Sequence, residues 1–88
     1  MNWSVELSNS AIKELKKLPR DRQTQIGRAL DEMESEPMAG DVIPLKGLEW
    51  KDRFRKRVGP YRIIFTLDRK ERIVAVSAIL IRSEKTYR

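Results

Sequence analysis

The feature that most constrains this chain is the alternation of side chains between residues 53 and 67. Before the Gly59-Pro60 break arginines occupy every second position, and after it aromatic and aliphatic residues do so. A period of two on both sides of a short turn predicts a β-hairpin, and successive side chains of a strand point to opposite faces. The arginines that leave this hairpin on one side are Arg53, Arg55, Arg57 and, across the turn, Arg62. So much positive charge on one strand face favours an anionic ligand.

The length and composition limit the other possibilities. The 88 residues predict a single domain over residues 1–88, small enough to bury only roughly 60% of its unfolded surface. Cysteine and histidine are both absent, which excludes disulfides and thiolate metal sites and removes the commonest general base. No signal peptide is recognised, and no apolar run approaches the roughly 20 residues that span a bilayer. We therefore expect a cytoplasmic protein without a membrane partner.

The positive charge is concentrated in the second half of the chain. Residues 1–45 hold six basic and eight acidic residues, whereas residues 46–72 hold ten basic and four acidic ones. Residues 73–88 add three basic residues and one acidic residue. This asymmetry favours a polyanionic partner such as nucleic acid, although a basic surface could also serve solubility or an acidic protein partner.

The hydrophobic spacing predicts the order β-α-α-β-β-β. A first strand contains Trp3, Val5 and Leu7, and Ser8, Asn9 or Ser10 can cap the helix that follows. The first helix is expected to bury Ala11, Ile12, Leu15 and Leu18, and it stops at Pro19. The second helix, which Asp21 can cap, is expected to bury Ile26, Ala29, Leu30 and Met33 before it ends near Pro37 and Gly40.

The second half is predicted to form most of the sheet. Residues 36–48 are expected to be a connector, and strands are predicted at about 50–58, 61–68 and 73–81. The last run is nearly all β-branched and aliphatic, which is typical of a strand buried on both faces. We predict an α+β fold, with an N-terminal helical hairpin against one face of a small, mostly antiparallel twisted sheet. The other face is then available for a ligand.

The residues available for chemistry are mainly arginines. Guanidinium groups bind phosphate through a planar fork and can neutralise the charge that develops on a phosphorane. RNA cleavage needs little else, because the 2′-hydroxyl is an internal nucleophile, although a tyrosine or lysine would have to carry protons. The candidates are Arg55, Arg57, Arg62 and Arg82, with Lys46, Lys51, Lys56 and Tyr87. Glu49 and Asp52 are close in sequence, but a metal site is not indicated and no cofactor is expected.

Several segments together resemble the RelE/ParE toxin superfamily of type II toxin–antitoxin modules. They include Leu45-Lys-Gly47, the run from Phe54 to Phe65 with its Arg-Val-Gly-x-Tyr-Arg pattern, Ile79-Leu-Ile-Arg82 and Tyr87. The helical segment from Ala11 to Pro19 fits the same pattern, so the resemblance covers essentially the whole chain. It implies the RelE-like fold and a cognate antitoxin that forms a hetero-oligomer with the toxin.

RelE-like members of this superfamily cut mRNA in the ribosomal A site without a metal. The resemblance implies that Arg62 and Arg82 stabilise the transition state and that Tyr87 orients the nucleotide. Arg55 and Arg57, where the best-known members have lysines, would hold RNA and contribute electrostatically. Further RNA contacts are expected from Arg53, Lys56, Lys46 and Lys51. Ile81 stands where a histidine is frequent.

Two other functions stay open. ParE-like members share the fold but inhibit DNA gyrase and are not nucleases. A relative that has lost toxicity could instead bind only its antitoxin. Arg62, Arg82 and Tyr87 together favour the RNase interpretation over these two, with the ribosome and mRNA as partners.

Overall fold

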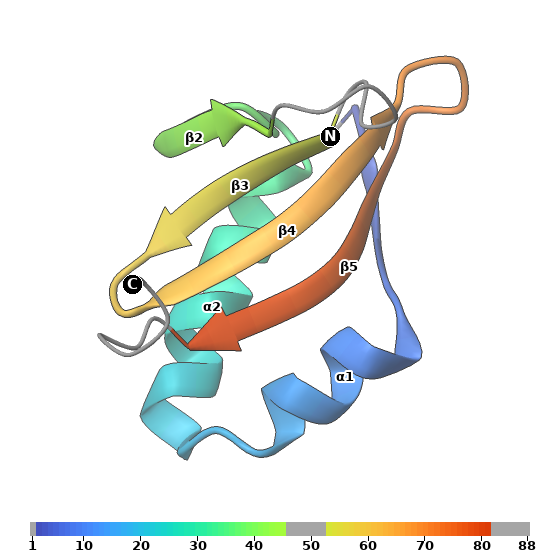
Figure 1. Ribbon diagram of the computed structural model, residues 1–88. Coiled ribbons are helices and arrows are strands. Elements are labelled where there is room, and N and C mark those ends of the chain that lie inside the picture. Colours follow the sequence, from blue (N-terminus) through green and yellow to red (C-terminus); the bar gives the residue numbers. More distant parts are fainter. Residues whose placement is uncertain (1, 46–52, 82–88) are drawn as a thin grey trace.

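The computed structural model describes residues 2–45 and 53–81, which form two helices and five strands. Their bounds are β1 Ser4–Leu7, α1 Asn9–Lys16, α2 Arg20–Met33, β2 Asp41–Pro44, β3 Arg53–Val58, β4 Tyr61–Asp68 and β5 Ile73–Ile81. The sheet order is β1-β5-β4-β3-β2, in which β1 is parallel to β5 and all other pairs are antiparallel. Both helices lie on one face of the sheet, as the predicted α+β fold requires (Figure 1).

The first helix is fixed to the sheet by its cap. Ser8 Oγ accepts a hydrogen bond from the Ala11 backbone N–H at 3.1 Å and donates one to the Ser77 carbonyl at 3.0 Å. One side chain therefore caps α1 and joins it to β5. Ala11 is fully buried, but Ile12, which was expected beside it in the core, is 37% exposed because this short helix turns Ala11 and Leu15 towards the sheet.

The second helix starts without the predicted aspartate cap. Its N-cap residue is Pro19, whose carbonyl accepts from the N–H groups of Arg22 and Gln23. Asp21 lies inside the first turn instead, where its Oδ1 accepts from the Arg22 N–H at 2.9 Å, so the cap prediction was wrong. The helix buries Ile26, Ala29 and Met33 as predicted. The helices α1 and α2 are joined by a short connection, and they run in different directions across the sheet (Figure 1).

The predicted connector contains a strand. Asp41–Pro44 pairs antiparallel with β3 and forms the edge of the sheet. The segment was missed because it is only four residues long and lies between turn-forming residues, with Gly40 before it and Pro44 at its end. Gly40, at φ 84°, makes the turn into it.

Strand β5 is buried on one face only, which corrects the expectation of two buried faces. Val74, Val76 and Ile79 are at most 2% exposed, whereas Leu80, which points to the other face, is 48% exposed. Both helices cover the same face of the sheet, so the second face of β5 is left without a helical layer. A bulge opposite Ile64 and Phe65 leaves Ser77 outside the pairing and restores the inward direction for Ile79.

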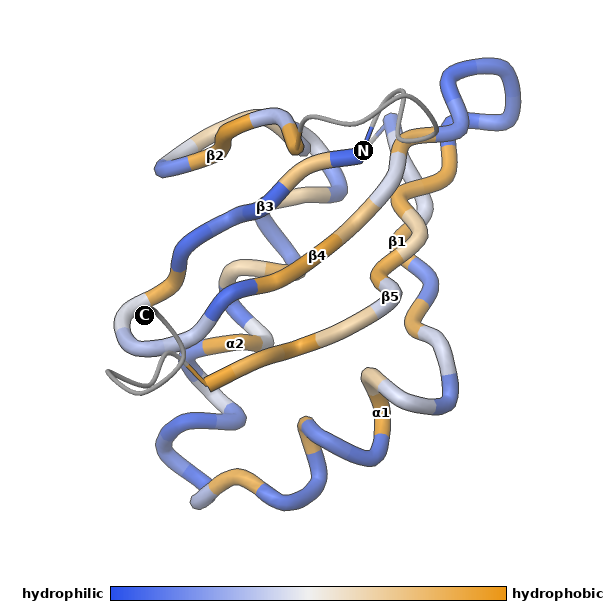
Figure 2. The backbone as a smooth tube through the Cα atoms, in the orientation of Figure 1, coloured by the Kyte–Doolittle hydropathy of each residue, from blue (hydrophilic) through white to orange (hydrophobic). Residues whose placement is uncertain are grey.

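The core lies between the helices and the centre of the sheet. Figure 2 shows the hydrophobic residues concentrated along β4 and β5, with hydrophilic residues along much of β3. Phe65 and Ile63 on β4 are fully buried, and the Phe54 and Phe65 rings stack with centroids 5.6 Å apart. Burying each such side chain contributes about 1.5–3 kcal/mol. Tyr61 is also buried, so it packs beneath the hairpin.

Candidate nucleic-acid interface

Four arginines lie on the sheet face that neither helix covers. On β3, the alternate residues Phe54 and Lys56 are buried towards the helices, and the register therefore directs Arg53, Arg55 and Arg57 to the opposite face. Arg62 joins them from β4, where it stands directly opposite Arg57. We call these four residues the arginine strip: Arg53, Arg55, Arg57 and Arg62.

The two arginines nearest the hairpin turn are paired closely. The Leu45 N–H donates to the Arg53 carbonyl at 2.9 Å, so the odd-numbered residues of β3 direct their backbone groups towards β2. Arg57 and Arg62 consequently form a non-hydrogen-bonded pair, in which Cα atoms lie about 4.5 Å apart and side chains approach most closely. Like charges in this position repel each other. An anion bound between them would be attracted by both side chains.

Arg55 provides a second indication of an anion site. It is half-buried, and its Nε is enclosed but has no hydrogen-bond acceptor among residues 2–45 and 53–81. Leaving such a donor unsatisfied costs about 1–3 kcal/mol. If the side chain turned so that this donor met a phosphate oxygen, the new hydrogen bond would offset that cost, and guanidinium–phosphate hydrogen bonds are among the stronger kinds in proteins.

Apolar side chains flank the arginine strip. Ile43 on β2 stands opposite Arg55 and is 41% exposed, and Leu80 on β5 stands opposite Arg62. The face therefore offers cations in the middle and apolar surface on both sides. Such a surface suits a ligand with anionic groups and flat rings, which is the composition of single-stranded nucleic acid.

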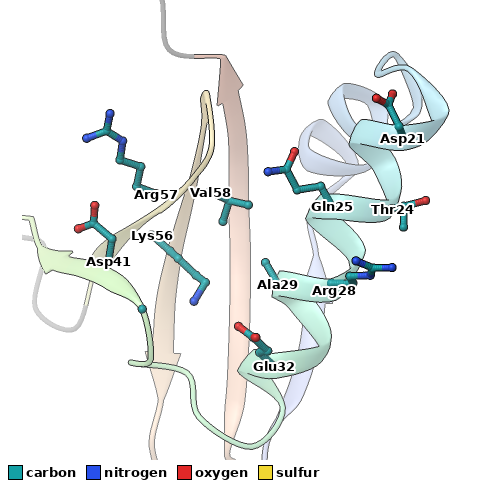
Figure 3. A pocket seen from close by; sticks show the side chains of 11 residues that line it. Asp21, Thr24, Gln25, Arg28, Ala29, Glu32, Asp41, Lys56, Arg57 and Val58 are labelled. Atoms are coloured by element: carbon teal, nitrogen blue, oxygen red, sulfur yellow. The ribbon is translucent and has the colours of Figure 1, made fainter.

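One carboxylate also lies beside the strip. Asp41 on β2 is paired with Arg57, and both side chains point away from α2 in Figure 3. No motif indicated this residue, because its segment was expected to be a connector. The sequence carried no clear signal for it, because Val42 and Ile43 are both apolar although only Val42 of the two packs against the core.

Lys56 does not belong to this face. It is 3% exposed, and its Nζ donates to the Ala39 carbonyl at 2.6 Å. In Figure 3 its side chain points towards α2, into a groove of about 410 Å³ between α2 and β2–β3. The prediction that Lys56 contacts RNA is therefore wrong, because its position on the strand directs it to the helix side.

Other candidates lie outside the described residues. These are Arg82, Tyr87, Lys46 and Lys51. The structure thus brings Arg53, Arg55, Arg57 and Arg62 together on one face. The functional roles of all these candidates stay predictions.

Two further observations concern the described residues. Within residues 2–45 and 53–81, no three acidic side chains are grouped so that they could hold a metal ion. None of the helices in these ranges is both long enough and apolar enough to cross a membrane.

Comparison with known proteins decides the family. Residues 5–86 match the family described as the ParE toxin of type II toxin–antitoxin systems. The chain belongs to this family. The toxin is also 25% identical over 89 residues to a Methanocaldococcus jannaschii protein named provisionally as toxin RelE1, covering 100% of the chain and 98% of that protein.

Solved structures support the same superfamily. The toxin is similar to the archaeal RelE–RelB complex from Pyrococcus horikoshii OT3, with a TM-score of 0.84 and 28% identity, covering 96% of this chain and 99% of that one. It also has the fold of the RelBE2 toxin–antitoxin complex from Mycobacterium tuberculosis, with a TM-score of 0.81, 23% identity and coverage of 93% and 100%. The resemblance to the RelE/ParE superfamily is thereby confirmed, and so is the RelE-like fold.

Proposed function

We propose that this toxin is a ribosome-dependent mRNA endonuclease of the cytoplasm, which inhibits translation and is neutralised by a cognate antitoxin. The observation that carries the proposal is the cross-strand pair of Arg57 and Arg62 on an open sheet face, next to Arg55 with its unsatisfied Nε. The register places these arginines at neighbouring positions on one face, from which several guanidinium donors could bind one phosphate.

The chemistry that such a cluster supports is stabilisation of negative charge. When the 2′-oxygen of RNA attacks the adjacent phosphorus, charge accumulates on the non-bridging oxygens of the phosphorane. Fixed guanidinium groups that meet this charge in the transition state lower the barrier, and removing one such donor typically costs a factor of about 10² to 10³. Arg82 and Tyr87 would complete the site from the end of the chain, in the roles implied by the resemblance.

The antitoxin partner is supported by the relatives. Similar toxins were solved as RelE–RelB and RelBE2 complexes with their antitoxins. We expect an antitoxin encoded beside this toxin to form a hetero-oligomer with it and to prevent RNA from reaching the arginine strip.

Gyrase inhibition is the second candidate function, because the matching family is described by its ParE toxin. A reconstituted translation reaction distinguishes the two. Purified toxin is added to ribosomes on a defined message, mRNA ends are mapped, and plasmid supercoiling by gyrase is measured in parallel. Cuts within codons of translated messages are expected, with supercoiling unchanged. Intact messages together with a supercoiling defect would establish the gyrase function instead.

A further inference from the structure

The register of the sheet places four side chains in one line across the open face. Asp41 pairs with Arg57, Arg57 with Arg62, and Arg62 with Leu80. Neighbouring strands are separated by about 4.8 Å. Asp41 is thus one strand away from the pair of arginines that would hold a phosphate.

The Asp41 side chain is exposed and available. It makes no hydrogen bond or ion pair with any residue in 2–45 or 53–81. Within these ranges, an ion pair is formed between Lys17 and Glu14. In Figure 3 its carboxylate lies on the same side of the sheet as the Arg57 guanidinium, on the far side of β3 from α2. It can therefore approach a ligand bound on the arginine strip.

The other carboxylates that the register directs to this face are distant. Glu6 is on β1, opposite Ala75 and three strands away from β3, which is about 14 Å. Asp68 is six residues along β4 from Arg62, or about 20 Å, and its Oδ1 accepts from the Glu71 N–H. Among the described strand residues, Asp41 is the carboxylate that the register places nearest to the Arg57–Arg62 pair.

RNA cleavage requires a group that accepts the proton of the 2′-hydroxyl. The sequence contains no histidine, and guanidinium groups stay protonated and cannot accept a proton. We propose that Asp41 is the general base that accepts the ribose 2′-hydroxyl proton. This inference rests on the proposed endonuclease function and assigns a catalytic residue to the same site.

RNA cleavage would then proceed as an internal transesterification. The Asp41 carboxylate takes the 2′-hydroxyl proton, and the 2′-oxygen forms a bond to the adjacent phosphorus. The bond from phosphorus to the 5′-oxygen of the next nucleotide breaks, and that oxygen takes a proton from water. The products are a 2′,3′-cyclic phosphate and a 5′-hydroxyl, and Asp41 releases its proton to solvent. Arg57 and Arg62 stabilise the non-bridging oxygens throughout.

The direction of the RNA follows from this assignment. Attacking and leaving oxygens lie on opposite sides of the phosphorus in an in-line displacement. Because Asp41 lies on the β2 side of Arg57, the nucleotide with the attacking 2′-oxygen lies towards β2. The leaving nucleotide then lies towards β5, where Leu80 offers exposed apolar surface.

The test compares Asp41→Asn with Glu6→Gln in the full-length toxin. Both substitutions remove one negative charge from the same sheet face and change the net charge equally, so they should alter RNA attraction similarly. Single-turnover cleavage of a message on programmed ribosomes is measured for both, together with toxin binding to a message carrying a 2′-deoxy nucleotide at the cut site. Asp41→Asn is expected to slow cleavage by a factor of about 10² to 10⁴ with binding kept. Glu6→Gln should cleave within about twofold of the wild type.

Two more readouts separate proton transfer from structural support. Asp41→Glu should recover part of the activity, because it restores a carboxylate. The residual rate of Asp41→Asn should rise about tenfold for each pH unit, since hydroxide must then replace the carboxylate. If Asp41→Asn cleaves like Glu6→Gln, or loses only RNA binding, Asp41 is not the base. If the wild type itself leaves translated messages intact, the proposed endonuclease function fails and the role of Asp41 fails with it.

Discussion

Arg62 lies on the middle strand of the sheet, beside the hairpin turn, between Arg57 on β3 and Leu80 on β5. Its neighbours on both strands belong to the surface that we propose contacts RNA. The contribution of one guanidinium group to cleavage is therefore best measured at Arg62. Its side chain can be removed while the buried neighbours Tyr61 and Ile63 are kept.

Arg62→Ala is expected to reduce cleavage by a factor of about 10² to 10³, because one donor to the developing charge is lost. Growth arrest on induction should disappear. Circular dichroism and the thermal midpoint show whether the fold is kept, and the exposed Arg20→Ala serves as the control. Full toxicity of Arg62→Ala at equal expression would place the site elsewhere.

Substitution of Lys56 tests the helix-covered face of the sheet. Lys56→Met should leave cleavage unchanged, because the side chain points to the helix side. Its ammonium group is buried with one hydrogen bond and with no described carboxylate within 4.0 Å, an arrangement that costs free energy. We expect the free energy of unfolding in urea to stay the same or to rise by about 1 kcal/mol. A large loss of cleavage with the stability kept would mean that Lys56 does contact RNA.

The β3–β4 hairpin is the element that sets the spacing of the arginine strip. Its two-residue turn has Gly59 at φ 56°, a value that favours glycine and is typical of the first central position of a type II′ turn. The turn fixes which residues face each other, so it decides that Arg57 opposes Arg62.

Gly59→Ala is expected to destabilise the toxin by about 1–2 kcal/mol. The added Cβ would lie 2.8 Å from Gln25 Nε2, and the backbone would be strained at a positive φ. Gly27→Ala is the matched control, since nothing lies within 4 Å of its added Cβ and the helix should gain about 0.5–1 kcal/mol. Thermal unfolding of both variants measures the difference, and equal shifts would contradict the role of the turn.

At the scale of the whole molecule, the two faces of the sheet differ in composition. The helix-covered face supplies the core, whereas the open face carries the arginine strip with Ile43 and Leu80 beside it. The net charge of +6 adds a general attraction for RNA that does not depend on sequence. Binding should therefore weaken steeply as salt is added.

Arg55→Gln should change this salt dependence in a defined way. Each phosphate contact to a single strand contributes about −0.7 to the slope of log K against log salt concentration. Removing the Arg55 charge should reduce the magnitude of the slope by about 0.7 in fluorescence titrations with a single-stranded oligonucleotide. Glu6→Gln should not reduce it, and an unchanged slope for Arg55→Gln would mean that Arg55 does not pair with phosphate.

Much of the fold could be predicted from local patterns. Strand β4 has the predicted bounds, and β5 runs from Ile73 to Ile81 as expected. Long segments rich in β-branched and aliphatic residues are readily recognised as strands from the sequence. The Ser8 cap was among those predicted, because an N-cap hydroxyl bonds to a backbone N–H only three residues further along the chain. Strand β2 could not be predicted, because its place in the sheet depends on pairing with β3 rather than on its own residues.

The sequence by itself determined the arginine alternation, the order of most elements and the resemblance to a toxin family, since each depends on short-range spacing. Only the tertiary structure decided which side of β3 faces the helices. That choice buries Lys56, exposes one face of β5 and sets Asp41 beside Arg57. The physical reason is that a strand has two faces, and what covers each depends on segments far away in the chain.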